Sequence, residues 1–140
     1  LRGYSTLGGQ ETIVFSLCHR NVGSQGRQLA LDFIDIVRAC FHACVSRRGY
    51  VRLPPEDDEP GMCGLLDRAM YGTRDAAQNW EKFYTQCMLS WGFVQGVSSP
   101  CVFWHPEREV RVVVHGDDFT VLASEDELDE FRKQISDSEV

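Results

Sequence analysis

The chain has 140 residues, of which 43% are hydrophobic, and a formal net charge of −7, so we expect one domain with a buried core. Residues 1–55 hold seven Lys or Arg and three Asp or Glu, whereas residues 56–140 hold seven and eighteen. An acidic chain is a poor free-standing nucleic-acid binder, because phosphate contacts dominate that affinity. No apolar run reaches the roughly 18–20 residues of a membrane helix, and we see no signal peptide. The missing initiator Met leads us to expect a piece of a longer protein.

The six cysteines form no Cys-x-x-Cys pair, so the spacing of a zinc site is absent from the sequence. Cys40 and Cys44 lie four residues apart among apolar neighbours, which favours a buried surface over a ligand set. We therefore expect structural or incidental thiols, no disulfide framework, and a reduced intracellular setting, cytoplasmic or nuclear rather than secreted.

The first strand is predicted at residues 28–36 (QLALDFIDI), after a segment, 1–28, that we expect to be loop or weak strand. Leu29, Leu31 and Phe33 alternate with the residues between them and are predicted to face the core. Asp35 falls on the same side of the strand. A carboxylate on a core-facing row is costly unless it is paired or binds a cation.

Residues 37–45 have the mixed apolar spacing of a short helix. Residues 50–61 (YVRLPPEDDEPG) predict a short strand that ends at two prolines and an acidic loop. Nothing in this loop holds the four acidic side chains 56–59 in a convergent arrangement. We interpret the run as a solvated loop and not as a metal site.

The clearest helix is predicted in residues 73–92 (TRDAAQNWEKFYTQCMLSWG). Its apolar residues recur at helical spacing and are interpreted as core, not as a stacking platform for bases: Ala76, Ala77, Trp80, Phe83, Tyr84, Cys87, Met88 and Trp91. Thr73 or Asp75 is placed to cap the start, and Gly92 is typical of the residue just past a helix end.

A β-hairpin is predicted around the turn His115-Gly116-Asp117-Asp118. Val110, Val112 and Val114 point one way before the turn, and Phe119, Val121 and Ala123 continue the second strand. A helix follows, with Ser124 and Glu127 as a capping box and Leu128, Phe131 and Ile135 as its apolar face. This order of elements predicts an α+β fold with mainly antiparallel strands.

The adjacent carboxylates Asp117 and Asp118 have two interpretations. The Gly-Asp-Asp run makes a good hairpin turn without any further role. Alternatively, the carboxylates bind a divalent cation, because Mg²⁺ is usually held by one or two carboxylates together with substrate phosphates. Asp35, at the end of a neighbouring strand, is the natural third carboxylate of a two-metal phosphoryl-transfer site. The spacing permits this meeting and does not establish it.

Four segments, in this order and at these intervals, resemble the reverse transcriptase domain of copia-type retrotransposons: FIDIVRACFHA, YVRLPPED, CGLLDRAMYGTRDAAQNWE and VHGDDFTVLAS. That family has an Asp at the end of an apolar strand, a short Val-x-Leu-Pro strand, a Leu-Tyr-Gly segment leading to a Trp-bearing helix, and an aromatic-Val-Asp-Asp hairpin. The resemblance spans residues 31–131. It implies a polymerase palm over residues 29–140, truncated before the thumb, with residues 1–28 a remnant of the fingers or a loop.

The resemblance implies that Asp35, Asp117 and Asp118 are catalytic. Asp35 and Asp117 would hold two Mg²⁺ ions, or Mn²⁺ in their place, and Asp118 would support the site. It further implies nucleotide- or template-binding roles for Cys40, Phe41, Tyr71, Gly72, Arg74, His115 and Gly116.

The activity implied is RNA-directed DNA polymerisation. A primer 3′-hydroxyl would attack the α-phosphate of a deoxynucleoside triphosphate on an RNA template. The expected partners are the template, the DNA primer, the dNTP and the remaining polyprotein domains (fingers, thumb, RNase H and integrase), with no membrane.

Two departures from the family pattern lie at the predicted site. His115 and Gly116 replace an aromatic-apolar pair before the aspartates, and Cys40 stands where the family has an aromatic side chain that blocks a ribose 2′-hydroxyl. Two other interpretations therefore stay open. The chain is a retroelement relic without activity, or an acidic interaction module whose aspartates serve only the turn.

Overall fold

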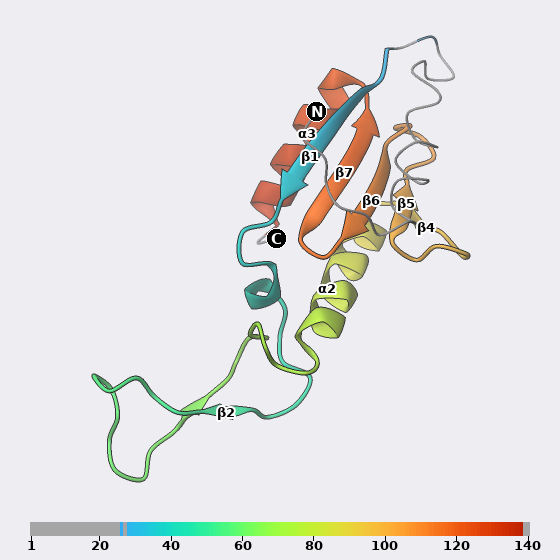
Figure 1. Ribbon diagram of the computed structural model, residues 1–140. Coiled ribbons are helices and arrows are strands. Elements are labelled where there is room, and N and C mark those ends of the chain that lie inside the picture. Colours follow the sequence, from blue (N-terminus) through green and yellow to red (C-terminus); the bar gives the residue numbers. More distant parts are fainter. Residues whose placement is uncertain (1–25, 27, 139–140) are drawn as a thin grey trace, which may run out of the picture.

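The computed structural model describes residue 26 and residues 28–138, so nearly all of the predicted N-terminal segment 1–28 lies outside the described residues. The main feature is a five-stranded antiparallel sheet in the order β1-β7-β6-β5-β4, and a separate two-stranded pair is formed by β2 and β3 (Figure 1). This mixture of helices and antiparallel strands confirms the α+β expectation. The elements are, in chain order, β1 (Ala30–Asp35), the 3₁₀ helix η1 (Ala39–His42), β2 (Tyr50–Val51), β3 (Gly64–Leu65), α2 (Ala76–Ser90), β4 (Val94–Gln95), β5 (Val102–Trp104), β6 (Arg111–His115), β7 (Asp118–Ala123) and α3 (Glu125–Asp137).

Helices α2 and α3 pack on one face of the sheet and form the main core with it (Figure 1). The alternation predicted for the hairpin is confirmed, because its helix-facing side chains are all buried: Val110, Val112, Val114, Phe119, Val121 and Ala123. The apolar face predicted for the last helix is confirmed as well, since Leu128, Phe131 and Ile135 are buried. In the middle helix, Trp80, Tyr84 and Met88 are buried as predicted, whereas Ala77 is exposed.

The prediction that Leu29, Leu31 and Phe33 face the main core is wrong. Phe33 is 70% exposed, and the residues of β1 that contact the helix-side core are Ala30 and Ile34. Leu29 and Leu31 belong to a smaller apolar cluster on the other face of the sheet. Both sides of β1 carry apolar residues, so alternation alone did not identify the face that the helices cover. Asp35 shares the side of Phe33 and is exposed, so the argument from a buried carboxylate does not apply to it.

The capping box predicted for α3 is also wrong. Ser124 is the N-cap residue but makes no side-chain capping hydrogen bond. The Glu127 carboxylate instead accepts a 2.6 Å hydrogen bond from Nε of Arg108, whose guanidinium also donates to Gln134. Both side chains of the Arg108–Glu127 ion pair are largely buried, at 21% and 23% exposed. A hydrogen bond between two charged groups is stronger than a neutral one, so Glu127 binds Arg108 in place of the backbone at the start of α3.

The helix end predicted at Gly92 is confirmed, since this residue follows α2 with a φ of 87°. The short helix predicted in residues 37–45 is confirmed as the single turn η1. Cys44 differs from the expectation of a buried surface. It is exposed, and its backbone forms an isolated antiparallel β-bridge with Arg68 on the neighbouring segment.

Within the described part of the chain, no helix combines the length and the apolar character that crossing a membrane requires.

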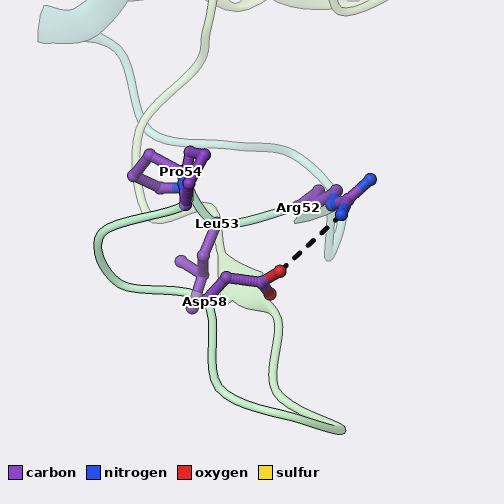
Figure 2. A pocket seen from close by; sticks show the side chains of 5 residues that line it. Arg52, Leu53, Pro54 and Asp58 are labelled. Atoms are coloured by element: carbon purple, nitrogen blue, oxygen red, sulfur yellow. Dashed lines mark ion pairs between the residues drawn. The ribbon is translucent and has the colours of Figure 1, made fainter.

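The β2–β3 pair and its connecting loop extend away from the sheet and the two helices (Figure 1). The predicted solvated character of acidic residues 56–59 is confirmed, since all four are exposed. A shallow pocket in this arm is lined by Arg52, Leu53, Pro54, Pro55 and Asp58 (Figure 2). Its ion pair joins Arg52 to Asp58 at 3.7 Å, and because the Arg52 side chain is 89% exposed the pair stabilises the arm little.

We predict that Glu127→Ala lowers the free energy of unfolding by about 1.5–3 kcal/mol, because it removes a hydrogen bond between charged groups. Ser124→Ala should cost less than about 0.5 kcal/mol, as is usual for a surface substitution that removes no specific contact. Urea denaturation of the two variants beside the parent chain measures both values. A larger loss from Ser124→Ala would mean that the capping box is the dominant interaction.

Candidate functional site

The hairpin turn consists of two residues. His115 of β6 pairs with Asp118 of β7, which leaves Gly116 and Asp117 as the connection. Gly116 has a φ of +63°, the conformation of the first central residue in a type II′ turn. A Cβ at Gly116 would meet no atom within 4 Å, so backbone conformation and not space favours glycine there. The substitution of glycine into this position is therefore compatible with a tight hairpin.

Asp35 lies directly opposite Asp118 in the antiparallel pairing of β1 with β7. Directly opposed residues project from the same face with their Cβ atoms about 4.5–5.5 Å apart. The same register places His115 opposite Asp118 on its other side. These three exposed residues form a row across the face of the sheet that lies away from the helices. Two residues 83 positions apart in the sequence are thus brought together by strand pairing.

Asp117 occupies the turn next to this row. Its carbonyl oxygen accepts a 3.0 Å hydrogen bond from the amide of Ile36, the residue after Asp35. All three predicted catalytic aspartates therefore lie at one end of the β1–β7 pair. Like charges placed directly opposite each other destabilise a sheet, and the exposure of Asp35 and Asp118 keeps this repulsion moderate because water screens it.

Asp35 and Asp118 face each other, and Asp117 adds a third carboxylate in the adjoining turn. Carboxylate oxygens are the kind of ligand that Mg²⁺ prefers. Among the described residues, no group of three His, Cys, Asp or Glu side chains is arranged to hold a metal ion. An ion bound between these carboxylates would therefore need further ligands, such as the oxygens of a substrate phosphate.

Trp80 of α2 fixes the turn from the helix side. Its indole Nε1 donates a 2.6 Å hydrogen bond to the carbonyl of Gly116. The ring is 3% exposed and packs edge-on against Tyr84 and Phe119, at centroid distances of 5.5 and 6.5 Å. Sequence spacing identified Trp80 as core only. Its contact with the turn joins residues 36 positions apart, and no local pattern indicates it.

Three of the predicted nucleotide-binding residues lie together beside Asp117. Phe41 and Tyr71 make an edge-to-face contact with ring centroids 5.9 Å apart. The Cys40 side chain is buried and lies close enough to Tyr71 for each group to affect the pKa of the other. Burial raises the pKa of the Cys40 thiol and of the Tyr71 hydroxyl, and the negative charge of Asp117 acts in the same direction on both. The Asp117 carboxylate is thus close enough to influence both groups.

The connection into α2 carries the other predicted binding residues. Gly72 adopts a φ of +88°, and Thr73 donates both its amide and its hydroxyl to the carbonyl of Met70, which closes the turn. Arg74 follows and is exposed, and the structure shows no contact between it and the three aspartates.

Asp75 is the N-cap residue of α2, but its side chain makes no capping hydrogen bond, so it does not have the capping role predicted for it. Its carboxylate accepts hydrogen bonds from the Ser46 hydroxyl at 2.6 Å and from Arg47 at 3.4 Å. The bond from Ser46 is the main reason that the pKa of Asp75 is lowered. The carboxylate therefore links the start of α2 to residues 46 and 47. Sequence reasoning missed this contact, because nothing in the local pattern connects segments so far apart.

We predict that Trp80→Phe lowers the free energy of unfolding by about 1–3 kcal/mol, because it removes one hydrogen bond and part of a buried ring. It should also speed hydrogen exchange at the Ile36 amide relative to the amides of β1, since the acceptor of that amide lies in the turn that Trp80 holds.

Trp91→Phe is the matched control, because it makes the same change of tryptophan to phenylalanine at the other end of α2, where Trp91 packs against Phe131. It should cost stability without a selective change at Ile36. Unchanged relative exchange at Ile36 in Trp80→Phe would contradict the role given to the indole.

The chain was compared with protein-family models, curated proteins and solved structures, and none of them matches it.

Proposed function

We propose that the chain is the palm portion of an RNA-directed DNA polymerase similar to those of copia-type retrotransposons. The observation that carries this proposal is the pairing of Asp35 with Asp118 on one exposed face, with Asp117 in the adjoining turn. Four sequence motifs in order support the same proposal. The substrates would be a deoxynucleoside triphosphate, a DNA primer and an RNA template.

In this proposal Asp35 and Asp117 hold the divalent ions and Asp118 supports them. Two bound Mg²⁺ ions would stabilise the attacking and leaving oxygens of an in-line phosphoryl transfer. The facing carboxylates supply negative charge at the end of the β1–β7 pair, where the triphosphate would share the ions. The repulsion between Asp35 and Asp118, a cost in the free protein, then favours cation binding.

The remaining residues would position the reactants. Phosphoryl transfer depends mainly on placement and charge neutralisation, so a fixed turn is an advantage. The indole of Trp80 and the amide of Ile36 hold that turn by its two carbonyls, at Gly116 and Asp117. Tyr71, which is half exposed, would contact the incoming nucleotide, and the buried Cys40 would support it from behind.

We predict that the purified chain extends a DNA primer annealed to an RNA template when dNTPs and Mg²⁺ or Mn²⁺ are supplied. Asp117→Asn and Asp118→Asn should each lower extension at least about 100-fold, because transition-state charge stabilisation of this kind is worth several kcal/mol. Asp57→Asn is the matched control. It makes the same change of charge on an exposed residue of the β2–β3 arm and should leave extension unchanged.

Extension that is lost in both site variants and retained in the control would support the polymerase proposal. Equal extension in all variants would mean that these aspartates do no catalysis. An absence of extension by the parent chain would contradict the activity for this chain and favour the inactive relic.

A further inference from the structure

Strand β1 lies at the edge of the five-stranded sheet, where β7 is its one partner among the described strands. It carries Asp35, so the register of β1 on β7 decides whether Asp35 faces Asp118. The amide of Ile36 bonds to the carbonyl of Asp117, which is the next pair along the two strands. Pairs with and without hydrogen bonds alternate between antiparallel strands, so Asp35 and Asp118 form a pair without hydrogen bonds, in which the side chains lie closest.

Two features of β1 do not favour this register. Asp35 and Asp118 carry like charges, and directly opposed like charges destabilise a strand pair. Apolar side chains also lie on both faces of β1, because Ala30 and Ile34 contact the helix-side core whereas Leu31 belongs to the cluster on the other face. Burial sets a register most strongly where one face of a strand is apolar and the other polar. Burial alone therefore specifies the register of β1 weakly.

Asp32 makes a specific contact in the middle of β1. It lies on the helix-facing row between Ala30 and Ile34, directly opposite the fully buried Val121. Its carboxylate accepts a 2.8 Å hydrogen bond from Nε of Arg132 in α3, and its side chain is 18% exposed. A largely buried carboxylate is costly without such a partner. The place opposite Val121 therefore suits Asp32 because Arg132 is there.

The guanidinium of Arg132 is itself held in place. Its Nη1 donates a 2.6 Å hydrogen bond to the carboxylate of Asp129, one turn earlier in α3. Helix α3 runs beside β1, and its buried side chains Leu128, Phe131 and Ile135 fix it in the main core (Figure 1). Arg132 thus ties an edge strand to a helix whose position the core determines.

We propose that Arg132 is a positioning residue, which acts through Asp32 to hold β1 in the register that places Asp35 opposite Asp118. A shift of β1 by two residues would leave each side chain on its own face but move Asp32 about 6.8 Å along the sheet. The guanidinium, which Asp129 also holds, would then lose this carboxylate. The role in catalysis rests on the proposed polymerase function, whereas the role in the register does not.

The test is NMR spectroscopy of the full chain, with nuclear Overhauser effects (NOEs) measured between the Hα atoms of β1 and β7. These NOEs are strong for directly opposed pairs without hydrogen bonds, whose Cα atoms lie about 4.5 Å apart. Asp35–Asp118 and Phe33–Thr120 are two such pairs. The corresponding NOEs between β5 and β6 are the internal reference, since these strands lie farther along the sheet from β1.

Arg132→Met removes the guanidinium and keeps an apolar stem. It should lower both β1–β7 NOEs to about half or less of their parent intensity relative to the reference, because a shifted register then competes. Asp32→Asn keeps the shape of the side chain and should act in the same direction, and it decides the question if Arg132→Met does not fold. Lys133→Met is the matched control. It removes a positive charge from the next, exposed position of α3 and should leave the NOEs unchanged.

Glu127→Ala separates positioning from stability. It breaks the ion pair of α3 with Arg108 and so destabilises the fold without removing a contact of β1. The folded form of this variant should keep the parent NOEs. Parent intensities in the folded form of either Arg132→Met or Asp32→Asn, or an equal loss in Glu127→Ala, would overturn the proposal.

Primer extension shows which of the two proposals fails. Reduced NOEs in Arg132→Met, without extension by the parent chain, would support the positioning role while contradicting the polymerase proposal. Where the parent chain extends the primer, Arg132→Met should lower extension about tenfold or more, because a small misplacement of a catalytic group is costly, and Lys133→Met should not. Extension by the parent together with unchanged NOEs in Arg132→Met would contradict the positioning role alone.

Discussion

The hydrogen bond from the Trp80 indole to the Gly116 carbonyl connects the helix layer to the turn on which the candidate site depends. It joins the centre of the aromatic core to an exposed turn, because the same ring packs against Tyr84 and Phe119. Once this turn is fixed, β7 is placed, and its pairing with β1 sets Asp35 opposite Asp118. A buried core therefore determines the arrangement of carboxylates on the opposite, exposed face.

The two faces of the sheet carry different kinds of side chain. The helix side holds the main apolar cluster, which supplies most of the stabilisation through burial. Among the described residues, the other side carries the row Asp35, Asp118 and His115 at one end and a small apolar cluster elsewhere. Opposed like charges on this face cost stability, and the fold tolerates them because they are exposed and the core lies elsewhere. This separation is what a site for a charged ligand requires.

Local patterns predicted the parts of the fold that depend on local physics. The helix predicted in residues 73–92, its glycine end at position 92, the valine alternation before the turn and the turn at residues 115–118 all appear in the structure. Sequence reasoning failed where the exposure or the hydrogen bond of a residue depends on a partner far away in the sequence. Phe33 is exposed because the helices cover the other side of β1, and Glu127 binds Arg108 in place of capping its helix. The strands β4 and β5, of two and three residues, are too short to show a pattern. The sequence indicated the three aspartates, but the partner of Asp35 follows only from the register, and the contacts of Trp80 and Asp75 only from the tertiary structure.

The central claim is that Asp35, Asp117 and Asp118 together bind divalent cations, and Mn²⁺ titration followed by amide NMR tests it most directly. Mn²⁺ prefers the same oxygen ligands as Mg²⁺, and its paramagnetism broadens the amide signals of nearby residues. The account predicts that broadening begins at residues 35–36 and 116–118, and that Asp118→Asn weakens it. The acidic residues 56–59, on the arm that extends away from the sheet, provide an internal comparison (Figure 1). Broadening that begins at residues 56–59 and spares the turn would contradict the account.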